Sequence, residues 1–378
     1  MSYEQIKKLI SERGYNYVFD VLYKKISDVD FPIYSSVSNN SEVVKMIKKI
    51  KKNYEPIIED NEYDTIMVRK TDLIDFKFNG HYVSMFTDGF EDYDTLITYF
   101  SGKCNMHARR YEMTGTPYEI WKRPEHRKKV LRELLNSKQD ITIKTLDAIN
   151  YKIAKACTYF KVTVVINLLT IFKSKKVLDL CAGWGERLLG AIIMNADYTG
   201  IDPSECLEPV YKQIIKATKT KNNCIVHKIG AEHLDDAIDK NDMYDTILFA
   251  PPYFDLEIYN NDPTQSINVY PTFDEWVQGF LFVSAKLAWE HLEVNGYLVI
   301  YISDYKNING IFSYTERTVL YCCGFLKNCR YEGSIGRTRD RNKYYSFWCF
   351  RKDPAYGEGD SEHYRKMYVK NYGDLAKD

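Results

Sequence analysis

The chain has 378 residues, of which 45% are hydrophobic, so it is long enough for one large domain or two and can bury a substantial core. With only 19 glycines and 11 prolines, it is neither a fibrous nor a disordered chain. Its 52 basic residues balance 52 acidic ones. This balance argues against a protein that coats nucleic acid uniformly, although it leaves room for a local basic face.

The nine cysteines are scattered, with no CxxC pair and no Cys/His spacing typical of a zinc site, and no signal peptide opens the chain. We therefore expect free thiols in a reducing, cytoplasmic compartment and no bound metal. The longest apolar run, Val162–Phe172, is shorter than the roughly 18 residues of a membrane span, so it predicts a buried helix and no membrane association. The 32 tyrosines, with many Lys, Ile and Asn, favour an AT-rich genome such as that of a virus or parasite, and a viral protein would act in the host cytoplasm.

Residues 1–140 show no single pattern, and we expect them to be an accessory region of mixed α+β structure. Apolar spacing predicts a helix from Ile6 to Lys25, a Ser/Asn-rich loop follows at Ser35–Ser41, and a basic helix is expected over Val43–Lys52. The sequence of this region does not indicate a particular fold. We interpret it as the part of the chain that recognises the substrate.

From residue 141 to residue 354, short β-branched runs alternate with amphipathic helices, which is typical of an open parallel sheet in an α/β domain. A capping box at Thr272 and Glu275 predicts the start of one long helix, and Asn295-Gly296 is expected to end it. The polar segment 355–378 is expected to be a loose tail. The expected strands are Lys176–Leu180, Tyr198–Ile201, Ile225–Lys228, Thr246–Phe249, Tyr297–Ile302 and Tyr345–Phe350.

The segment KKVLDLCAGWGERLLGA predicts a strand, a glycine turn and a helix, in the order that a cofactor-binding crevice needs. Gly183 and Gly185 let the backbone turn sharply and approach a ligand, while Asp179 at the strand end can order the loop or meet an ammonium. Asp202 ends the next expected strand, seventeen residues beyond Gly185, where a carboxylate can bind ribose hydroxyls. Because Leu188 stands where a dinucleotide fingerprint has its third glycine, a cofactor without a pyrophosphate is favoured.

Two of these segments, LDLCAGWGE and GIDPS, resemble motifs I and II of class I S-adenosylmethionine-dependent methyltransferases, and ACTYFKVTVVINLL resembles motif X of amino-methyltransferases. The resemblance implies a Rossmann-like methyltransferase sheet with S-adenosylmethionine as cofactor. It places the methionine part at the glycine turn, the ribose at Asp202 and the adenine at Ala231-Glu232, whereas Phe160 could equally be a core aromatic. The cofactor-binding residues that it implies are Phe160, Asp179, Cys181, Ala182, Gly183, Gly185, Asp202, Pro203, Ala231 and Glu232.

The most informative stretch is YDTILFAPPYFDLEIY, in which an expected strand runs into Ala250-Pro251-Pro252-Tyr253. Two prolines fix the backbone where a parallel strand meets the ligand crevice, and the carbonyl of Pro251 can accept a hydrogen from an amine. The ring of Tyr253 or Phe254 can stack on a base rotated out of its helix. Holding the hydrogens of the amine turns its lone pair toward a methyl donor, as SN2 transfer requires.

This stretch resembles motif IV of DNA and RNA amino-methyltransferases, in which Asp, Asn or Ser precedes Pro-Pro and an aromatic residue. The longer string, with Gln265-Ser266, is similar to a group of phage and large-DNA-virus DNA methyltransferases. Ala250 departs from the motif because it lacks the side-chain oxygen that the family offers to the target amine. Asp255 or Glu257 could supply that acceptor, or the protein could have become a binding module. The catalytic loop that the resemblance implies comprises Ala250, Pro251, Pro252, Tyr253 and Phe254.

Between Lys103 and Arg132, nine Lys and Arg residues stand against three Asp and Glu, interleaved with Tyr111, Tyr118 and Trp121. Such a segment can contact phosphates, although a merely solvated helical face would show the same pattern. The candidates for contacts with a nucleic-acid backbone are Arg109, Arg110, Lys122, Arg123, Arg127, Lys128 and Lys129.

Together, the motifs favour an enzyme that methylates an exocyclic amine of a nucleic-acid base, and adenine N6 or cytosine N4 in DNA is the leading hypothesis. Nucleic acid, DNA before RNA, is therefore the expected partner. Methylation of an RNA base is the nearest alternative, and a glutamine amide in a protein is a more distant one. The remaining hypothesis is a degraded methyltransferase that binds nucleic acid or a partner enzyme.

Overall fold

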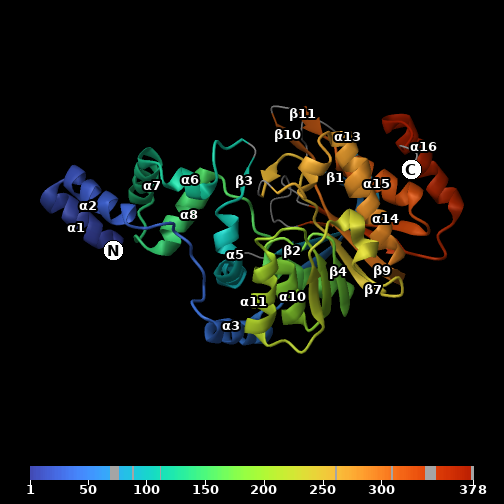
Figure 1. Cartoon of the computed structure of the whole chain (residues 1–378), viewed down its shortest axis with the longest axis horizontal. Coiled ribbons are helices and arrows are strands. Elements are labelled where there is room, and N and C mark those ends of the chain that lie inside the picture. The colour runs from blue at the N-terminus through green and yellow to red at the C-terminus, as the bar shows by residue number, and fades with distance from the viewer. Residues whose placement is uncertain are drawn as a thin grey trace.

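The computed structural model describes residues 1–68, 76–86, 89–110, 112–259, 262–307, 310–336 and 346–375. Over these ranges the chain forms a nine-stranded sheet with helices on both faces and a cluster of N-terminal helices beside it (Figure 1). None of the helices described is long and apolar enough to cross a lipid bilayer. The same residues contain no group of three or more His, Cys, Asp and Glu that could hold a metal ion.

The sheet has the strand order β1-β2-β12-β13-β9-β7-β4-β5-β6. The strands from β9 to β6 are parallel, whereas β13 runs antiparallel to both of its neighbours. The portion from β12 to β6 therefore has the order of a Rossmann-like methyltransferase sheet, which confirms the predicted α/β fold. The strands are β1 (Ile57–Val68), β2 (Phe76–Phe86), β4 (Lys176–Asp179), β5 (Asp197–Ile201), β6 (Cys224–His227), β7 (Tyr244–Phe249), β9 (Leu292–Tyr301), β12 (Cys329–Gly336) and β13 (Ser346–Lys352).

All six predicted strands are present, although β9 begins five residues before its expected start. Tyr345, the expected first residue of the last strand, lies outside the described residues. Strand β12 and the β1–β2 hairpin were not predicted. The hairpin extends the sheet because Gly333 to Gly336 of β12 pair in parallel with His81 to Ser84 of β2. Strands β1 and β2 thus belong to the sheet, although they precede the expected boundary at residue 140.

Helices pack on both faces of the sheet and create two hydrophobic cores. One face carries α9, which matches the predicted buried helix, together with α10, α11 and the predicted basic helix α3. The other face carries η2, the π-helical η3, α14 and α15. These helices are α3 (Asn40–Asn53), α9 (Val162–Phe172), α10 (Glu186–Met194), α11 (Glu208–Thr218), η2 (Ala231–Asp236), α13 (Phe273–Glu275), η3 (Trp276–Phe282), α14 (Val283–Glu290) and α15 (Thr315–Phe325).

The helical segment from α13 to α14 begins as predicted but ends early. Thr272 Oγ1 accepts a hydrogen bond from the Glu275 backbone N–H at 3.3 Å, and the Thr272 N–H donates to Glu275 Oε2 at 3.2 Å, so the capping box is confirmed. Helix α14 ends at Glu290, and the predicted end at Asn295-Gly296 is wrong. These two residues lie instead in a bulge of β9, where Asn295 takes a φ of 67°. Asn and Gly are favoured both at the ends of helices and in β-bulges, so the sequence pattern does not distinguish these two structures.

Five helices form a helical cluster to one side of the sheet, around buried side chains that include Leu22, Trp121 and Leu134 (Figure 1). The single helix predicted over Ile6–Lys25 is divided in two because Gly14 takes a φ of 82° between them. The cluster comprises α1 (Tyr3–Arg13), α2 (Tyr15–Ser27), α6 (Pro117–Trp121), α7 (Pro124–Asn136) and α8 (Ile143–Ala154). Helix α8 thus packs with the N-terminal helices, although it follows the expected boundary at residue 140.

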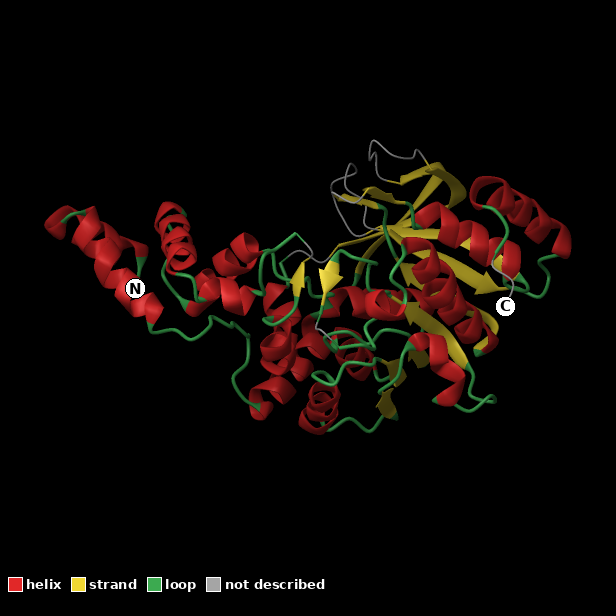
Figure 2. Cartoon of the chain, turned by 45° about the horizontal axis from the view of Figure 1, so that its top comes forward, coloured by secondary structure: helices red, strands yellow, loops and turns green. Residues whose placement is uncertain are grey.

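Short elements connect the helical cluster with the sheet. Two of them, β3 and β8, pair in antiparallel fashion between the two parts of the molecule (Figure 2). Basic residues of β3 are thereby fixed beside the segment that follows the expected catalytic loop. The elements that lead from the sheet to the helical cluster are α4 (Glu91–Asp94), η1 (Thr95–Ile97), α5 (Thr98–Asn105) and β3 (Arg109–Arg110). The other short elements described are β8 (Glu257–Ile258), α12 (Ser266–Val269), β10 (Tyr305–Asn307) and β11 (Gly310–Phe312).

The segment after Pro354 is a helix and not the loose tail that its polarity suggested. Helix α16 (Glu358–Tyr372) packs against α15, and Tyr368 is only 1% exposed. Its ring lies edge-on to Phe282 and Phe325, at centroid distances of 5.9 and 5.5 Å. The expectation was wrong because tyrosines at four-residue spacing, such as Tyr368 and Tyr372, give an otherwise polar helix one apolar stripe.

Candidate active site

The glycine turn after β4 has the backbone geometry that the sequence predicted. Gly183 and Gly185 take φ values of 59° and 96°, in the left-handed region that favours glycine. A Cβ atom at Gly185 would lie 2.5 Å from Ile214 Cδ1, so a larger residue would force the Ile214 side chain on α11 to move. The turn therefore brings the N-terminus of α10 to the carboxyl end of β4, where parallel strands form a ligand crevice.

A cavity of about 820 Å³ opens above this turn and extends past the end of β7. It contains both predicted halves of the site, because residues of the cofactor motifs and of the PPY loop line the same space. The predicted residues that line it are Phe160, Cys181, Gly183, Asp202, Pro203, Ala231, Glu232, Ala250, Pro251, Pro252 and Tyr253. Four predicted residues are absent from its lining, namely Asp179, Ala182, Gly185 and Phe254.

Asp179 is used inside the protein and does not face the cavity. Its Oδ2 accepts hydrogen bonds from Arg187 Nε at 2.7 Å and from the Tyr198 hydroxyl at 2.6 Å, and the side chain is fully buried. Its Oδ1 accepts from the Cys181 N–H at 3.3 Å. Of the two roles expected for Asp179, these hydrogen bonds show the first: the carboxylate orders the loop and does not line the cavity where an ammonium would bind. Ala182 is likewise fully buried, behind the turn.

Asp202 lies at the end of β5, as predicted, and holds the glycine turn in place. Its Oδ2 accepts from the Gly183 N–H at 2.9 Å, and its Oδ1 accepts from the Ser204 N–H at 3.0 Å. Burial raises the pKa of Asp202 to about 6 despite these hydrogen bonds. Each carboxylate oxygen has a second lone pair, so Asp202 can still accept hydrogen bonds from a ligand in the cavity.

Sequence reasoning missed Glu186, the first residue of α10. Glu186 Oε1 accepts from the Phe160 N–H at 2.8 Å, whereas Oε2 is buried without a hydrogen-bond partner. The side chain lines the cavity at 1% exposure, and burial raises its pKa to about 7. Its place directly after the glycine turn was a signal in the sequence, because the N-terminus of that helix was expected to face the ligand.

Arg187 was missed in the same way and lies between the cavity and Asp179. Its guanidinium carbon lies 5.1 Å from the centroid of the Phe160 ring, and its side chain lines the cavity while bonding Asp179. The Phe160 ring also lies edge-on to Tyr301 and Phe347, at 5.5 and 5.8 Å. Phe160 is therefore both packed in the core and exposed to the cavity, so the two interpretations of this residue are compatible.

The PPY loop continues β7 and presents Tyr253 to the cavity. Edge contacts from Tyr305 and Tyr314, at centroid distances of 5.8 and 5.5 Å, fix the ring of Tyr253. Phe254 turns away, and its ring packs against Phe273 at a centroid distance of 5.9 Å. The expectation that Phe254 belongs to the catalytic loop is corrected, because a neighbouring aromatic cluster holds its side chain.

Of the two carboxylates expected to replace the missing oxygen of Ala250, only Glu257 lines the cavity. Asp255 is 3% exposed, and its carboxylate accepts a hydrogen bond from the Tyr305 hydroxyl. Glu257 Oε1 accepts from the Thr158 N–H at 3.2 Å, and Oε2 accepts from the Tyr259 hydroxyl at 2.7 Å. Burial raises the pKa of Glu257 above its ordinary value.

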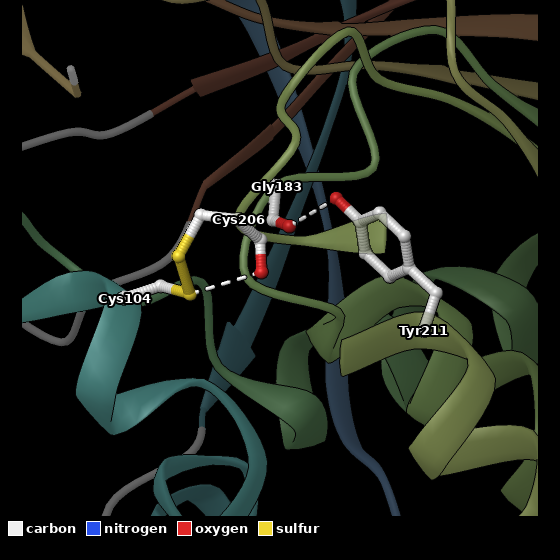
Figure 3. Close-up of a disulfide and its surroundings, with 4 residues drawn as sticks. All are labelled: Cys104, Gly183, Cys206 and Tyr211. Carbon is white, nitrogen blue, oxygen red and sulfur yellow. Dashed lines mark hydrogen bonds between the residues drawn. A yellow bond between two sulfur atoms is a disulfide. The ribbon is translucent and has the colours of Figure 1, made fainter. Parts of the chain in front are cut away.

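A disulfide joins two elements at the rim of the cavity. Cys104 on α5 is bonded to Cys206, which follows Asp202 in the loop after β5 (Figure 3). Both cysteines line the cavity. Nearby, the hydroxyl of Tyr211 donates to the Gly183 carbonyl, so α11 also holds the glycine turn. The expectation that all cysteines are free thiols is wrong for this pair, because the fold brings together two residues that are 102 positions apart.

None of the seven predicted basic residues lines the cavity. Arg127 donates to the carbonyls of Ser27 and Lys122, both at 3.2 Å, and Arg123 donates to Thr114 Oγ1 at 3.0 Å. These two arginines therefore stabilise the helical cluster. Arg109 and Arg110 are half-buried on β3, and the exposed basic side chains are those of Lys122, Lys128 and Lys129. Tyr111 lies outside the described residues, and Trp121 is fully buried.

No known protein family and no curated protein sequence matches this chain. Three similar solved structures can be named. An rRNA methylase from Streptococcus thermophilus is 14% identical, with a TM-score of 0.34 over 52% of this chain and 99% of that one. The N-methyltransferase NodS from Bradyrhizobium japonicum, in complex with S-adenosylhomocysteine, is 13% identical, with a TM-score of 0.34 over 50% of this chain and 84% of that one. Magnesium protoporphyrin IX methyltransferase from Synechocystis, with bound S-adenosylmethionine, is 12% identical, with a TM-score of 0.35 over 50% of this chain and 77% of that one.

The strand order of the sheet identifies the fold without reference to these similar structures. Parallel strands β6-β5-β4-β7-β9 are followed by the antiparallel β13 and then by β12, and the cavity lies at the carboxyl ends of β4, β5 and β7. The chain therefore has the Rossmann-like fold of the S-adenosylmethionine-dependent methyltransferases.

Proposed function

We propose that this chain transfers a methyl group from S-adenosylmethionine to an exocyclic amine of a nucleic-acid base, with adenine N6 or cytosine N4 in DNA as the first candidates. One observation carries the proposal: the glycine turn at Gly183 and the Pro251-Pro252-Tyr253 loop, which belong to separate motifs, line one cavity. A methyl donor bound at the turn and a flat amine held by the loop can meet in that space.

The groups along the cavity fit S-adenosylmethionine, which supplies an electrophilic methyl group when bound. The unpartnered Oε2 of Glu186 suits the ammonium of the cofactor, because a buried oxygen without a hydrogen bond costs free energy that a cationic donor offsets. Asp202 keeps lone pairs for the ribose hydroxyls. Ala231 and Glu232, at the start of η2, border the same cavity where the adenine is expected.

The loop fits a planar amine. Two prolines limit the backbone freedom of the loop, and Tyr253 presents an aromatic ring that three-dimensional packing holds in one orientation. Stacking of a base on such a ring stabilises binding by about 1–3 kcal/mol. In this proposal the Pro251 carbonyl accepts one hydrogen of the amine and so directs the nitrogen lone pair toward the methyl group.

The helical cluster is the proposed recognition side of the molecule. Register places Arg110 on β3 directly opposite Glu257 on β8, so the basic segment is hydrogen-bonded to the chain that continues from the catalytic loop. Exposed Lys122, Lys128 and Lys129 lie on the same cluster and can contact phosphates. Nucleic acid held there would extend toward the cavity.

The proposal is tested by incubating the protein with tritiated S-adenosylmethionine and four probes: duplex DNA, single-stranded DNA, RNA and denatured protein. Label in DNA is the expected result. Label confined to RNA would keep the chemistry and change the polymer, while label confined to protein would contradict a nucleic-acid substrate. Tyr253→Ala is the matched variant, and it should lose transfer while retaining affinity for S-adenosylhomocysteine.

Ala250 favours one second candidate, a nucleic-acid-binding module that has lost the methyl transfer reaction. Losing a hydrogen bond to a buried amine costs about 1–3 kcal/mol, which slows a reaction without abolishing it. Binding of DNA without transfer to any probe would support this second candidate. Failure to bind S-adenosylhomocysteine would strengthen it further.

A further inference from the structure

The absence of an oxygen at Ala250 leaves the proposed reaction without the side-chain acceptor that its motif normally provides. In the described stretch from Ala250 to Tyr270, Glu257 is the only carboxylate that lines the cavity. Ser266 Oγ accepts from Trp276 Nε1 at 3.0 Å, and Gln265 Oε1 accepts from the Tyr259 N–H at 2.8 Å, so these side chains are anchored by other groups. Glu257 is therefore the strongest acceptor in this part of the site.

The surroundings of Glu257 keep its carboxylate in one orientation. The Thr158 N–H and the Tyr259 hydroxyl each donate to a different oxygen, and each oxygen retains a second lone pair. Arg110 lies directly opposite on β3, and its charge opposes the effect of burial on the pKa of Glu257. The ring of Tyr259 is fixed in turn by an edge contact with Trp184 at 5.6 Å.

Glu257 and the proposed stacking residue, Tyr253, face a common space. Tyr253, Glu257 and Tyr301 line the same cavity, and its aromatic wall also includes Trp184 and Tyr259. A base stacked on Tyr253 would thus present its edge to a region that contains a carboxylate.

We propose that Glu257 accepts a hydrogen bond from the target amine and then takes its proton, in place of the side-chain oxygen that is absent at Ala250. This inference rests on the proposed function. As the new N–C bond forms, the C–S bond to the methyl group breaks and the sulfur keeps the electron pair. The nitrogen then releases one proton to Glu257, which returns it to solvent.

The first test compares Glu257→Gln with the wild type on the DNA and RNA probes. Loss of the proton acceptor should lower kcat about 100-fold, in the range typical of general-base removal. Affinity for S-adenosylhomocysteine should stay within twofold, because the cofactor contacts do not include this residue. Glu112→Gln, an exposed glutamate paired with Lys155 at 3.0 Å, is the matched control and should keep the wild-type rate.

Rescue separates a catalytic role from a structural one. Ala250→Asp restores an oxygen at the motif position, and in the Glu257→Gln background it should raise kcat at least tenfold. A purely structural defect at Glu257 would not respond to a carboxylate introduced at position 250. An unchanged rate in the double variant, or a wild-type rate in Glu257→Gln, would overturn the inference.

A binding measurement decides the same point without turnover. In the presence of saturating S-adenosylhomocysteine, the wild type should bind adenosine or cytidine about tenfold more tightly than the corresponding dimethylamino nucleoside, which has no N–H to donate. Glu257→Met removes both oxygens at similar size and should abolish that preference. Equal affinities in the wild type, or no binding of either nucleoside, would overturn the inference. Absence of methyl transfer with the preference intact would instead contradict the proposed function alone.

Discussion

Replacing Asp202 with asparagine should weaken cofactor binding strongly while leaving the fold intact. Its two carboxylate oxygens accept from the Gly183 and Ser204 N–H groups at 2.9 and 3.0 Å, and the residue lines the cavity. Asparagine turns one of these oxygens into an NH₂ group that meets a backbone donor, so the glycine turn loses one bond and the ribose loses a charged acceptor. One hydrogen bond to a charged group contributes about 1.5–3 kcal/mol, which corresponds to a roughly 10- to 100-fold higher Kd.

Isothermal titration calorimetry with S-adenosylhomocysteine measures this change directly. Asp197→Asn is the matched control, since Asp197 begins the same strand, accepts from the Asn223 N–H at 2.9 Å and does not line the cavity. Its Kd should stay within twofold of the wild-type value. If Asp202→Asn, with native circular dichroism, also binds within twofold of the wild type, the ribose site is misplaced and the reasoning is refuted.

The same structure leads to three further predictions. Glu186→Gln should weaken the binding of S-adenosylhomocysteine about tenfold, but the affinity for 5′-methylthioadenosine, which has no amino-acid part, should stay within twofold. Because burial raises the pKa of Glu186 to about 7, the wild-type affinity for S-adenosylhomocysteine should fall as the pH drops through that value and the carboxylate becomes neutral. A pH-independent Kd would contradict the pairing with an ammonium. Cys104→Ser should lower the free energy of unfolding in guanidinium chloride by about 2–4 kcal/mol, since the disulfide joins residues that are 102 positions apart. A reductant should lower the free energy of unfolding of the wild type and not that of the variant. An equal effect on both proteins would argue against the disulfide. Replacing Lys122, Lys128 and Lys129 together removes exposed lysines of the helical cluster. The slope of log Kd for DNA against log salt concentration should then fall by about 0.9 for each phosphate that a lysine no longer neutralises. An unchanged slope would show that these lysines are only a solvated face.

The parallel part of the fold could be predicted because its signals are local. Apolar runs such as Val162–Phe172, and the glycine turn with φ values of 59° and 96°, carry their structure in a few neighbouring residues. The PPY loop was found for the same reason, since two prolines fix a backbone wherever they stand. Strand β12 was missed because an arginine, a glutamate, a serine and two glycines interrupt its apolar pattern.

The roles of individual side chains depended on contacts that no local pattern contains. The sequence left open whether Asp179 orders the loop or meets an ammonium, and only the contacts of its Oδ2 with Arg187 and Tyr198 from other elements decide this. Glu186, whose Oε2 is unpartnered at the cavity, is the carboxylate that we propose for the ammonium. Cys104 and Cys206 are likewise brought together only by the packing of α5 against the loop after β5.

We propose that the cavity shared by the cofactor turn and the PPY loop methylates nucleic-acid bases. Mass spectrometry of nucleosides tests this in the DNA and RNA of a methylation-free bacterium that expresses either the wild type or Tyr253→Ala. DNA from cells with the wild type should contain N6-methyladenine or N4-methylcytosine, and DNA from cells with the variant should show background levels. No modified base in either nucleic acid, or equal modification by the variant, would contradict it.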